Sequence, residues 1–226
     1  MHHRAHPIPA LILCFTLAAT AAVASGGSRS TAPRAPEPAA DPIAEAQQHY
    51  DMGLSNRNKA WKLEKQLEDG GDVDRAKIKK KIAKQYKRAI SQFRLATGKN
   101  SQHHAAFSDL GYCLRKTGAY EGALGAYERA LVLSPGYSKA IEYRAEAYLG
   151  LNRIEDAKSA YVQLFGSDRE EAAKLMEAMK TWVETRRGDP GDIGEAAVES
   201  FGEWVSEREA LAGKTASLSD LSHRKW

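Results

Sequence analysis

Few side chains in this sequence stand where they could do chemistry. His103 and His104 form an adjacent pair, and histidine is a common metal ligand and proton carrier. Neighbouring side chains point about 100° apart on a helix, so a metal ion shared by this pair is disfavoured. We expect instead that the two histidines mark the start of a surface helix.

Cys113 is the second candidate for reactivity. The only other cysteine, Cys14, lies in the first segment of the chain. Cys113 stands among apolar positions of helical spacing, which favours a small buried side chain over an exposed reactive thiol. An intramolecular disulfide is excluded if the first segment is removed.

Motifs of known enzymes and cofactor sites do not occur in the sequence. There is no phosphate-binding Gly-rich loop, no paired zinc cysteines, no HExxH and no nucleophile elbow. The sequence therefore predicts a protein that is not an enzyme and that uses no metal and no cofactor.

Charge is unevenly distributed along the chain. The formal net charge of +4 is too small to indicate nucleic-acid binding by itself. Residues 57–99 are strongly basic, however, and residues 155–209 are acidic. The plainest interpretation is two solvated helical faces. Two alternatives stay open: docking on an acidic surface such as phospholipid head groups, or self-association. The basic positions named for either role are Lys79, Lys80, Lys81 and Lys84.

Residues 1–24 are typical of a secretory signal peptide. A weakly basic start precedes an apolar run, Pro9 to Ala24, that ends in a small-x-small pattern. This run is short for a spanning helix, which needs about 20 residues. We expect export to a periplasm or to the outside, with membrane anchoring if the signal stays uncleaved. Residues 25–42 are rich in Pro, Ala, Gly and Ser and predict a flexible linker.

An internal repeat organises the rest of the chain. Three columns of residues recur with a period of 34, and they lie at i, i+4 and i+7, on one face of a helix. The first column contains a small residue, the second an aromatic one, and the third a small or apolar one. These columns are Ala89, Ala123 and Ala157; Phe93, Tyr127 and Tyr161; and Ala96, Ala130 and Leu164.

The middle unit resembles the tetratricopeptide repeat. It has an aromatic residue, Leu-Gly, a large apolar residue, Ala, an aromatic residue, Ala and a closing Pro at the expected offsets. The resemblance implies an all-α solenoid of about three helix-turn-helix repeats. The third unit departs from the pattern at Arg144 and Arg169. The matching residues of the middle unit are Phe107, Leu110, Gly111, Leu114, Ala123, Tyr127, Ala130 and Pro135.

The first repeat contains an insertion. The Gly that corresponds to Gly111 is Gly53, and these two positions are further apart than one repeat period by 24. The inserted segment continues the helical pattern on both sides of a Gly-Gly turn, with Asp72 or Asp74 as the cap of the returning helix. We therefore expect an antiparallel hairpin whose helices are each about 12 residues longer, or roughly 18 Å.

The repeat domain is predicted to cover residues 43–187, ending in a capping helix that covers the last repeat. Residues 188–211 predict one additional helix, and residues 212–226 a disordered tail.

In the tetratricopeptide family the first helix of each repeat lines a concave groove that binds peptides. The resemblance therefore implies a protein or peptide partner, while nucleic acid is disfavoured. Tyrosines at the groove positions could present flat surfaces to a ligand or simply pack between helices. The implied groove residues are Tyr50, Arg57, Asp109, Tyr112, Arg115, Lys139, Tyr143 and Glu146.

Overall fold

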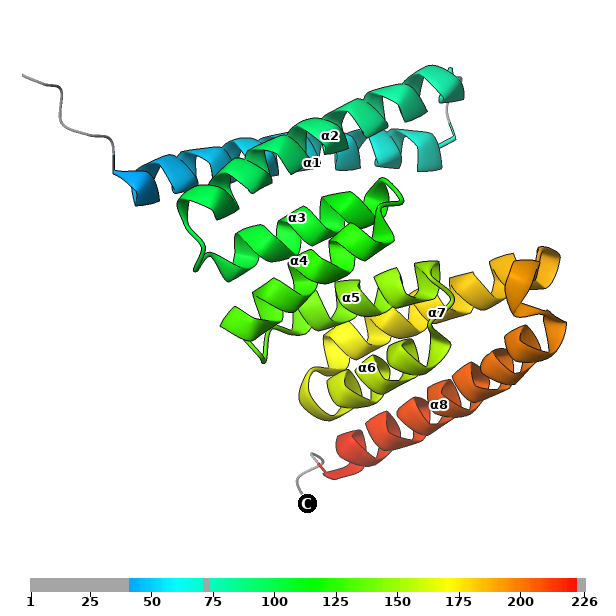
Figure 1. Cartoon of the computed structure of the whole chain (residues 1–226). Coiled ribbons are helices and arrows are strands. Elements are labelled where there is room, and N and C mark those ends of the chain that lie inside the picture. Colours follow the sequence, from blue (N-terminus) through cyan, green and yellow to red (C-terminus); the bar gives the residue numbers. More distant parts are fainter. Residues whose placement is uncertain (1–40, 71–73, 223–226) are drawn as a thin grey trace, which may run out of the picture. The chain divides into compact units, whose positions relative to one another are not determined.

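The structure, a computed structural model, describes residues 41–70 and 74–222, with side chains described as far as Thr215. The predicted signal peptide and all but the end of the predicted linker lie outside this part. Ala40–Trp226 forms one compact unit by itself. The described part is helical, without strands (Figure 1). Its elements are α1 (Pro42–Glu68), α2 (Arg75–Lys99), α3 (His104–Lys116), α4 (Tyr120–Leu133), α5 (Ser138–Gly150), α6 (Ile154–Ser167), α7 (Arg169–Gly188), the 3-10 turn η1 (Gly191–Ile193) and α8 (Glu195–Ser222).

Aspartates begin three of the helices. Asp41 accepts a hydrogen bond from the backbone N–H of Ile43, and Asp74 accepts one from that of Lys77, each 2.9 Å long. Asp168 does the same at the start of α7. Each carboxylate satisfies an N–H group that the helix leaves without a partner and suits the positive end of the helix dipole. Asp74 is therefore the cap of the returning hairpin helix.

The repeat columns form the core. All nine of their side chains are at most 3% exposed. They belong to α2, α4 and α6, the second helices of the first three pairs. The small column lets the neighbouring helix approach, and the aromatic column fills the space beside it. The all-α repeat architecture predicted from the sequence is confirmed.

The first pair is lengthened as the insertion predicted. α1 has 27 residues and α2 has 25, whereas α3 has 13 and α4 has 14. A Cβ atom added at Gly53 would lie 2.4 Å from the Phe93 ring, and one added at Gly111 would lie 2.5 Å from the Tyr127 ring. Gly53 therefore has the same place in the first repeat as Gly111 has in the second.

The end of the chain differs from the prediction. α7 packs against α5 and α6, and α8 packs against α7, so α7 and α8 continue the stack as a fourth helix pair. α8 begins at Glu195 and continues to Ser222, so the additional helix does not end at Leu211 and the tail predicted for residues 212–226 begins too early. No Pro interrupts the sequence after Leu211, and Ala212 is partly buried, which favours continuation of the helix.

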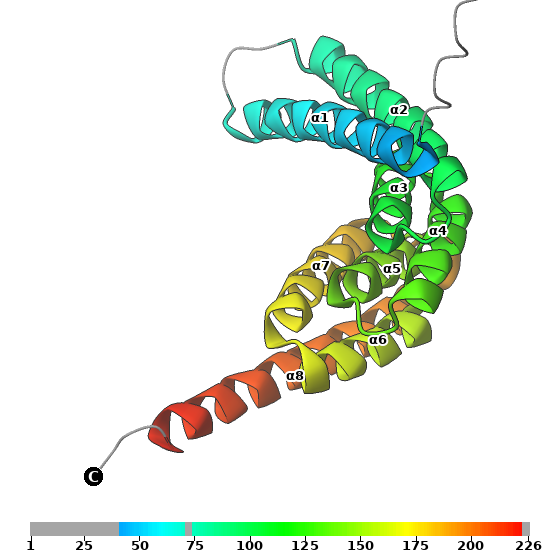
Figure 2. The ribbon, with the colours of Figure 1, turned by 90° about the vertical axis from the view of Figure 1, so that its left-hand side faces the viewer.

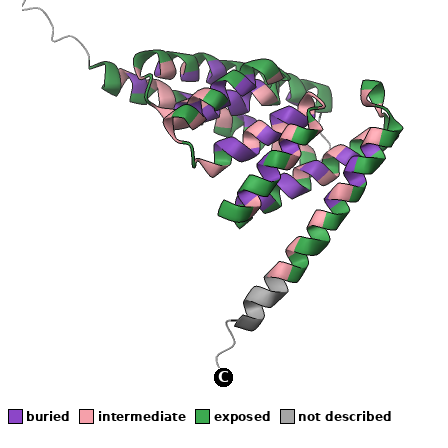
Figure 3. Cartoon of the chain, turned by 60° about the horizontal axis from the view of Figure 1, so that its bottom comes forward, coloured by how far each residue is buried: buried purple, intermediate pink, exposed green. Residues whose placement is uncertain are grey.

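The four pairs follow one another so that α1, α3, α5 and α7 line the inner, concave side, while α2, α4 and α6 lie outside (Figure 2). Buried residues lie between the helices, and the last turns described on α8 are largely exposed (Figure 3). The concave side is therefore built from the first helix of every pair.

Candidate functional site

The eight predicted groove residues lie on the first helices of the three repeats, as the resemblance implied. Tyr50 and Arg57 belong to α1, and Lys139, Tyr143 and Glu146 belong to α5. The other three, on α3, are Asp109, Tyr112 and Arg115. Whether these side chains bind a partner stays a prediction, but their surroundings show which of them are available to one.

Asp109 ties α1 to α3. Its carboxylate forms an ion pair with the Arg57 guanidinium and accepts a hydrogen bond of 2.9 Å from the Tyr50 hydroxyl. Burial raises the pKa of Asp109, while the adjacent Arg57 acts in the opposite direction. Burial and the nearby Asp109 also raise the pKa of Tyr50, so the phenol remains the donor. These three residues bind one another and form part of the groove wall.

An aromatic cluster continues this wall. The Trp61 indole N–H donates to the Tyr112 hydroxyl over 2.7 Å, and the Tyr112 and Tyr143 rings are 5.0 Å apart. Tyr112 is only 9% exposed, so it packs between helices, the second of the two roles left open by the sequence. Trp61 is 37% exposed and lies beneath the Arg57 guanidinium. Trp61 is thus the most exposed aromatic residue of this wall, and it was not among the residues predicted for the groove.

A second ion pair joins α3 to α5. Arg115 binds the Glu146 carboxylate, and its guanidinium lies 5.3 Å from the Tyr112 ring and 5.6 Å from the Tyr143 ring. Glu142 lies one turn before Glu146 and is 3% exposed. Its Oε2 has no hydrogen-bond donor in the described structure, and burial and then Glu146 raise its pKa. Arg115 and Glu146 pair with each other, but the Arg115 Nε and the Glu142 Oε2 are both buried without a hydrogen-bond partner in the described structure.

Beyond this pair the groove contains a hollow of about 630 Å³ that reaches from α1 to α7. Glu64 forms a 2.9 Å ion pair with Lys116 at one side. At the other side Arg186 donates to the side-chain oxygen of Asn152 over 3.1 Å and has no ion pair with a described carboxylate. Of the predicted residues, only Arg115 and Glu146 line this hollow. The full lining is Glu64, Arg115, Lys116, Tyr120, Glu146, Leu149, Gly150, Ala178, Thr181, Trp182, Thr185 and Arg186.

Sequence reasoning missed the wall that α7 contributes. Trp182 donates its indole N–H to the Leu149 carbonyl over 2.8 Å, and this contact holds α7 beside α5. From the sequence, this helix was predicted only as a cap on the repeats. Met179 lies one repeat period after Ala145 and is fully buried, and that register could have identified α7 as a further inner helix.

Lys139 lies apart from the hollow. It is exposed at the beginning of α5, and its charge acts on Asp109 to lower the pKa of that carboxyl. The four lysines named for the basic hairpin are exposed on the first half of α2, outside the groove. The residues predicted from the sequence therefore lie on two separate surfaces, the groove and the exposed side of α2.

His103 and Cys113 have structural places in the helices. His103 is the N-cap of α3, and burial together with His104 lowers the pKa of His103. Cys113 is fully buried, and burial raises the pKa of its thiol. In the described residues no group of three or more His, Cys, Asp or Glu side chains could hold a metal ion. No described helix has the length and apolar character needed to cross a membrane.

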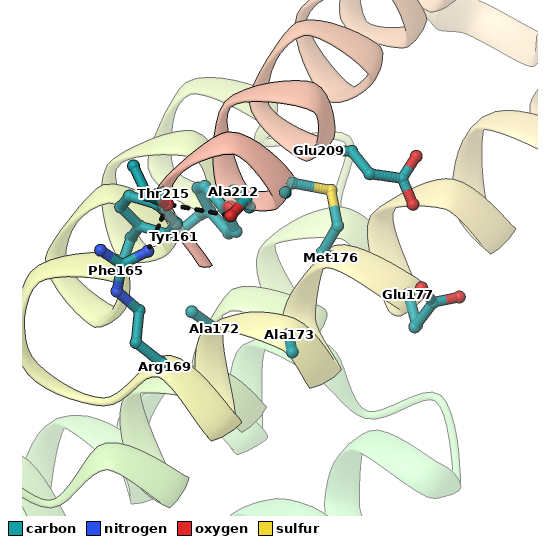
Figure 4. Close-up of a pocket in the computed structure, with 11 residues that line it drawn as sticks. Tyr161, Phe165, Arg169, Ala172, Ala173, Met176, Glu177, Glu209, Ala212 and Thr215 are labelled. Carbon is teal, nitrogen blue, oxygen red and sulfur yellow. Dashed lines mark hydrogen bonds between the residues drawn. The ribbon is translucent and has the colours of Figure 1, made fainter. Parts of the chain in front are cut away.

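A second and more apolar hollow of about 570 Å³ opens between α6, α7 and the far part of α8 (Figure 4). Arg169 lies 3.4 Å over the Phe165 ring, and Thr215 donates to the Ala212 carbonyl. Tyr161 and Met176 line the hollow and are almost fully buried. The far part of α8 is therefore not closely packed against α6 and α7 at this hollow.

Fold and groove together define an all-α helical-repeat protein with a concave surface. Residues 83–138 match the family model described as Tetratricopeptide repeat. These residues comprise most of α2, all of α3 and α4, and the start of α5. This part of the chain therefore has the tetratricopeptide-repeat pattern. No curated protein matches the chain.

Several solved structures are similar to the chain. The Arabidopsis OM64 TPR domain has a TM-score of 0.45 and 14% identity, and the match covers 59% of this chain and 93% of that one. The first TPR of Spaghetti (RPAP3), bound to HSP90 peptide SRMEEVD, has a TM-score of 0.41 and 18% identity, with 58% and 94% covered. MamA protein has a TM-score of 0.38 and 17% identity, with 75% and 94% covered.

Proposed function

We propose that this protein is an exported scaffold or adaptor that binds a segment of another protein in its concave groove. The observation that carries the proposal is the hollow of about 630 Å³ lined by the inner helices of all four pairs. Its volume is within the range of about 300–1,000 Å³ that is common for ligand sites. Export rests on the predicted signal peptide, and the groove requires neither a cofactor nor a catalytic step.

Two features support a peptide as the ligand. The ion pairs Arg57–Asp109 and Arg115–Glu146 tie α1 to α3 and α3 to α5, so the wall is held in place before a ligand arrives. Preorganisation of this kind reduces the entropy lost on binding. The exposed face of Trp61 provides apolar area next to these polar groups.

The charge of the hollow favours an acidic group on the bound segment. Arg115 and Lys116 are each matched by a carboxylate, Glu146 and Glu64 respectively. Arg186 is the remaining cation, and its hydrogen-bond partner among the described residues is a neutral amide oxygen. A carboxylate on the ligand can form a charge-assisted pair with Arg186, and such pairs are stronger than neutral hydrogen bonds.

Site-specific photocrosslinking tests this proposal. A photoreactive amino acid replaces Thr185, which is exposed and lines the hollow. The control position is Val162, which is 56% exposed on the outer helix α6 and lies outside the hollow. In cells that produce the chain, we expect one discrete crosslinked protein from position 185 and none from position 162. Mass spectrometry then identifies the captured segment. The same products from both positions would contradict binding in the groove.

Charge variants provide a second control. Lys116→Ala with Arg186→Ala removes two cations from the hollow, and we expect binding of the captured segment to weaken by about tenfold or more. Lys59→Ala with Lys214→Ala removes the same charge from two exposed sites outside it. Equal losses in both double variants, with unchanged helicity, would place the binding site elsewhere.

A further inference from the structure

The helix α2 has a charge unlike that of any other described element. Its sequence contains ten Lys and Arg residues and no Asp or Glu. Several cations on other helices have carboxylate partners, as Lys116, Lys174 and Lys180 do. Apart from Arg75, which donates to the Leu67 carbonyl, eight exposed cations of α2 form no ion pair within the described residues. They are Lys77, Lys79, Lys80, Lys81, Lys84, Lys87, Arg88 and Arg94.

Seven of these cations share one side of the helix. The positions from Lys77 to Arg88 are linked by intervals of three and four, and Arg94 follows Lys87 by seven, spacings that place side chains on one side of a helix. Lys79 is the exception because its position falls on another side of the helix. It lines a different hollow with Glu64 and Glu68 of α1, which Lys87 also reaches. We call the other seven cations the basic face. From Lys77 to Arg94 it extends over about 26 Å, at a rise of about 1.5 Å per residue.

The basic face is open along its length. All seven of its side chains are exposed. A shallow hollow of about 590 Å³ runs along its middle, and no carboxylate lines it. The first half of α2 belongs to the hairpin, which extends past the neighbouring helices α3 and α4 (Figure 1). A broad surface can therefore approach it. The hollow is lined by Lys80, Ala83, Lys84, Lys87, Arg88 and Ser91.

The chemistry of the face suits a surface with many equivalent negative charges. It consists mainly of long flexible lysines, without an aromatic or acidic side chain that would select one partner geometry. Each such cation brought to an anionic bilayer strengthens binding by about fivefold. The predicted signal peptide and linker precede α1 and would bring the chain to a membrane during export.

We propose that the basic face of α2 docks the protein on a bilayer of anionic phospholipids. The groove lies on the inner helices and the basic face on the outer side of α2, so each surface can be removed without the other. Loss of peptide binding and loss of lipid binding are therefore separate outcomes.

The test uses the fragment Ala40–Trp226, which is one compact unit, with its helicity checked by circular dichroism. Binding is measured by co-sedimentation with vesicles of phosphatidylcholine and phosphatidylglycerol, mixed about three to one, and with vesicles of phosphatidylcholine alone. We expect binding only to the mixed vesicles, and we expect it to weaken strongly between about 0.1 M and 1 M salt as the Debye length falls.

A matched pair of variants tests the face itself. Lys80→Ala, Lys84→Ala and Lys87→Ala together should weaken binding to the mixed vesicles by about 100-fold. Lys59→Ala, Lys62→Ala and Lys65→Ala remove the same charge from the other helix of the hairpin and should weaken it by less than about fivefold. Equal losses would show that total charge, not the basic face, is responsible, and would overturn the proposal.

Two further outcomes would also overturn it. Binding to phosphatidylcholine alone with the same affinity would exclude recognition of anionic lipid. Fluorescence anisotropy with a single-stranded oligonucleotide and sedimentation velocity of the fragment test the other acidic partners. If the α2 variant loses oligonucleotide binding or self-association while vesicle binding is unchanged, the face binds nucleic acid or a second copy instead.

Discussion

The first and last helix pairs complete the same stack by different means. α1 and α2 retain the repeat signature, with Gly53 against Phe93, and are joined to α3 by the buried polar contacts of Asp109. α7 and α8 have no described Gly that meets an aromatic ring, and aromatic packing joins them instead. The Trp182 and Phe201 rings are 5.5 Å apart, edge to face.

The two pairs also differ in charge. α2 is exclusively basic among its Lys, Arg, Asp and Glu side chains, whereas exposed glutamates recur every fourth position along the first part of α8. Glu199 among them pairs with Arg187 on α7 over 3.0 Å. Stacking therefore depends on shape and apolar burial, and the exposed charge of each end is free to vary. Three substitutions test how the two ends are held, and a fourth, in α5, tests a buried charge between them.

Phe201→Ala should have the largest effect. Phe201 is 1% exposed, and its removal leaves a cavity between α7 and α8 that costs about 3–5 kcal/mol. Chemical denaturation measures the loss, and amide exchange should show α8 losing protection before α1 to α4. Leu211→Ala, at a position 42% exposed on the same helix, is the control and should cost less than about 1 kcal/mol. Uniform loss of protection would show that the last pair is not a separable unit.

Asp109→Ala should cost about 2–4 kcal/mol at the other end of the stack. It leaves the Arg57 guanidinium, whose side chain is 16% exposed, without its counter-charge and removes the acceptor of the Tyr50 hydroxyl. A double-mutant cycle with Arg57→Met measures the coupling. A coupling energy near zero would mean that packing alone joins α1 to α3.

Gly53→Ala should cost about 1–3 kcal/mol, because the new Cβ atom would lie 2.4 Å from the Phe93 ring. Gly125→Ala in α4 is the matched control. It meets no atom within 4 Å and should stabilise the protein by about 0.5–1 kcal/mol through the better helix propensity of Ala. Thermal unfolding compares the two, and equal effects would contradict the close approach at Gly53.

Glu142→Gln should have the smallest effect and depends on pH. Because burial raises the pKa of Glu142, the folded protein binds this proton more tightly than the unfolded chain does. The stability that protonated Glu142 contributes is complete below the pKa of a Glu in the unfolded chain. It is lost as the pH rises towards the raised pKa of Glu142 in the folded protein. The variant should therefore be about 1 kcal/mol more stable at about pH 8 and equal to the parent at about pH 4. A difference of the same size at both pH values would exclude titration of Glu142 as its cause.

The repeat core was predictable because residues one repeat period apart have the same packing position in successive helix pairs. The columns of Ala89, Phe93 and Ala96 and their equivalents are buried because each allows a neighbouring helix to approach. The length of the insertion after Gly53 could be obtained by counting the residues between Gly53 and Gly111. This works because both glycines have the same place in their repeats, against an aromatic ring. The continuation of α8 was missed because no comparable signal distinguishes a partly covered helix from a loose tail.

For the candidate site, the sequence identified the inner helices of the repeats but not the state of each side chain. An aromatic residue at a groove position has the same sequence signal whether it partly faces solvent, as Trp61 does, or is enclosed, as Tyr112 is. Burial depends on neighbours that are distant in the chain. The same holds for Arg186, which comes beside Lys116 and Glu64 only because α7 packs against α5.

Local spacing and composition were enough to specify the helical class, the repeat period, the extended first pair and the basic character of α2. The pairing of α7 with α8, the enclosure of Asp109 and the hollow across the inner helices could be learned only from the folded chain. Those features arise from the positions of helices relative to one another, and helix packing sums many weak contacts between residues far apart in the chain.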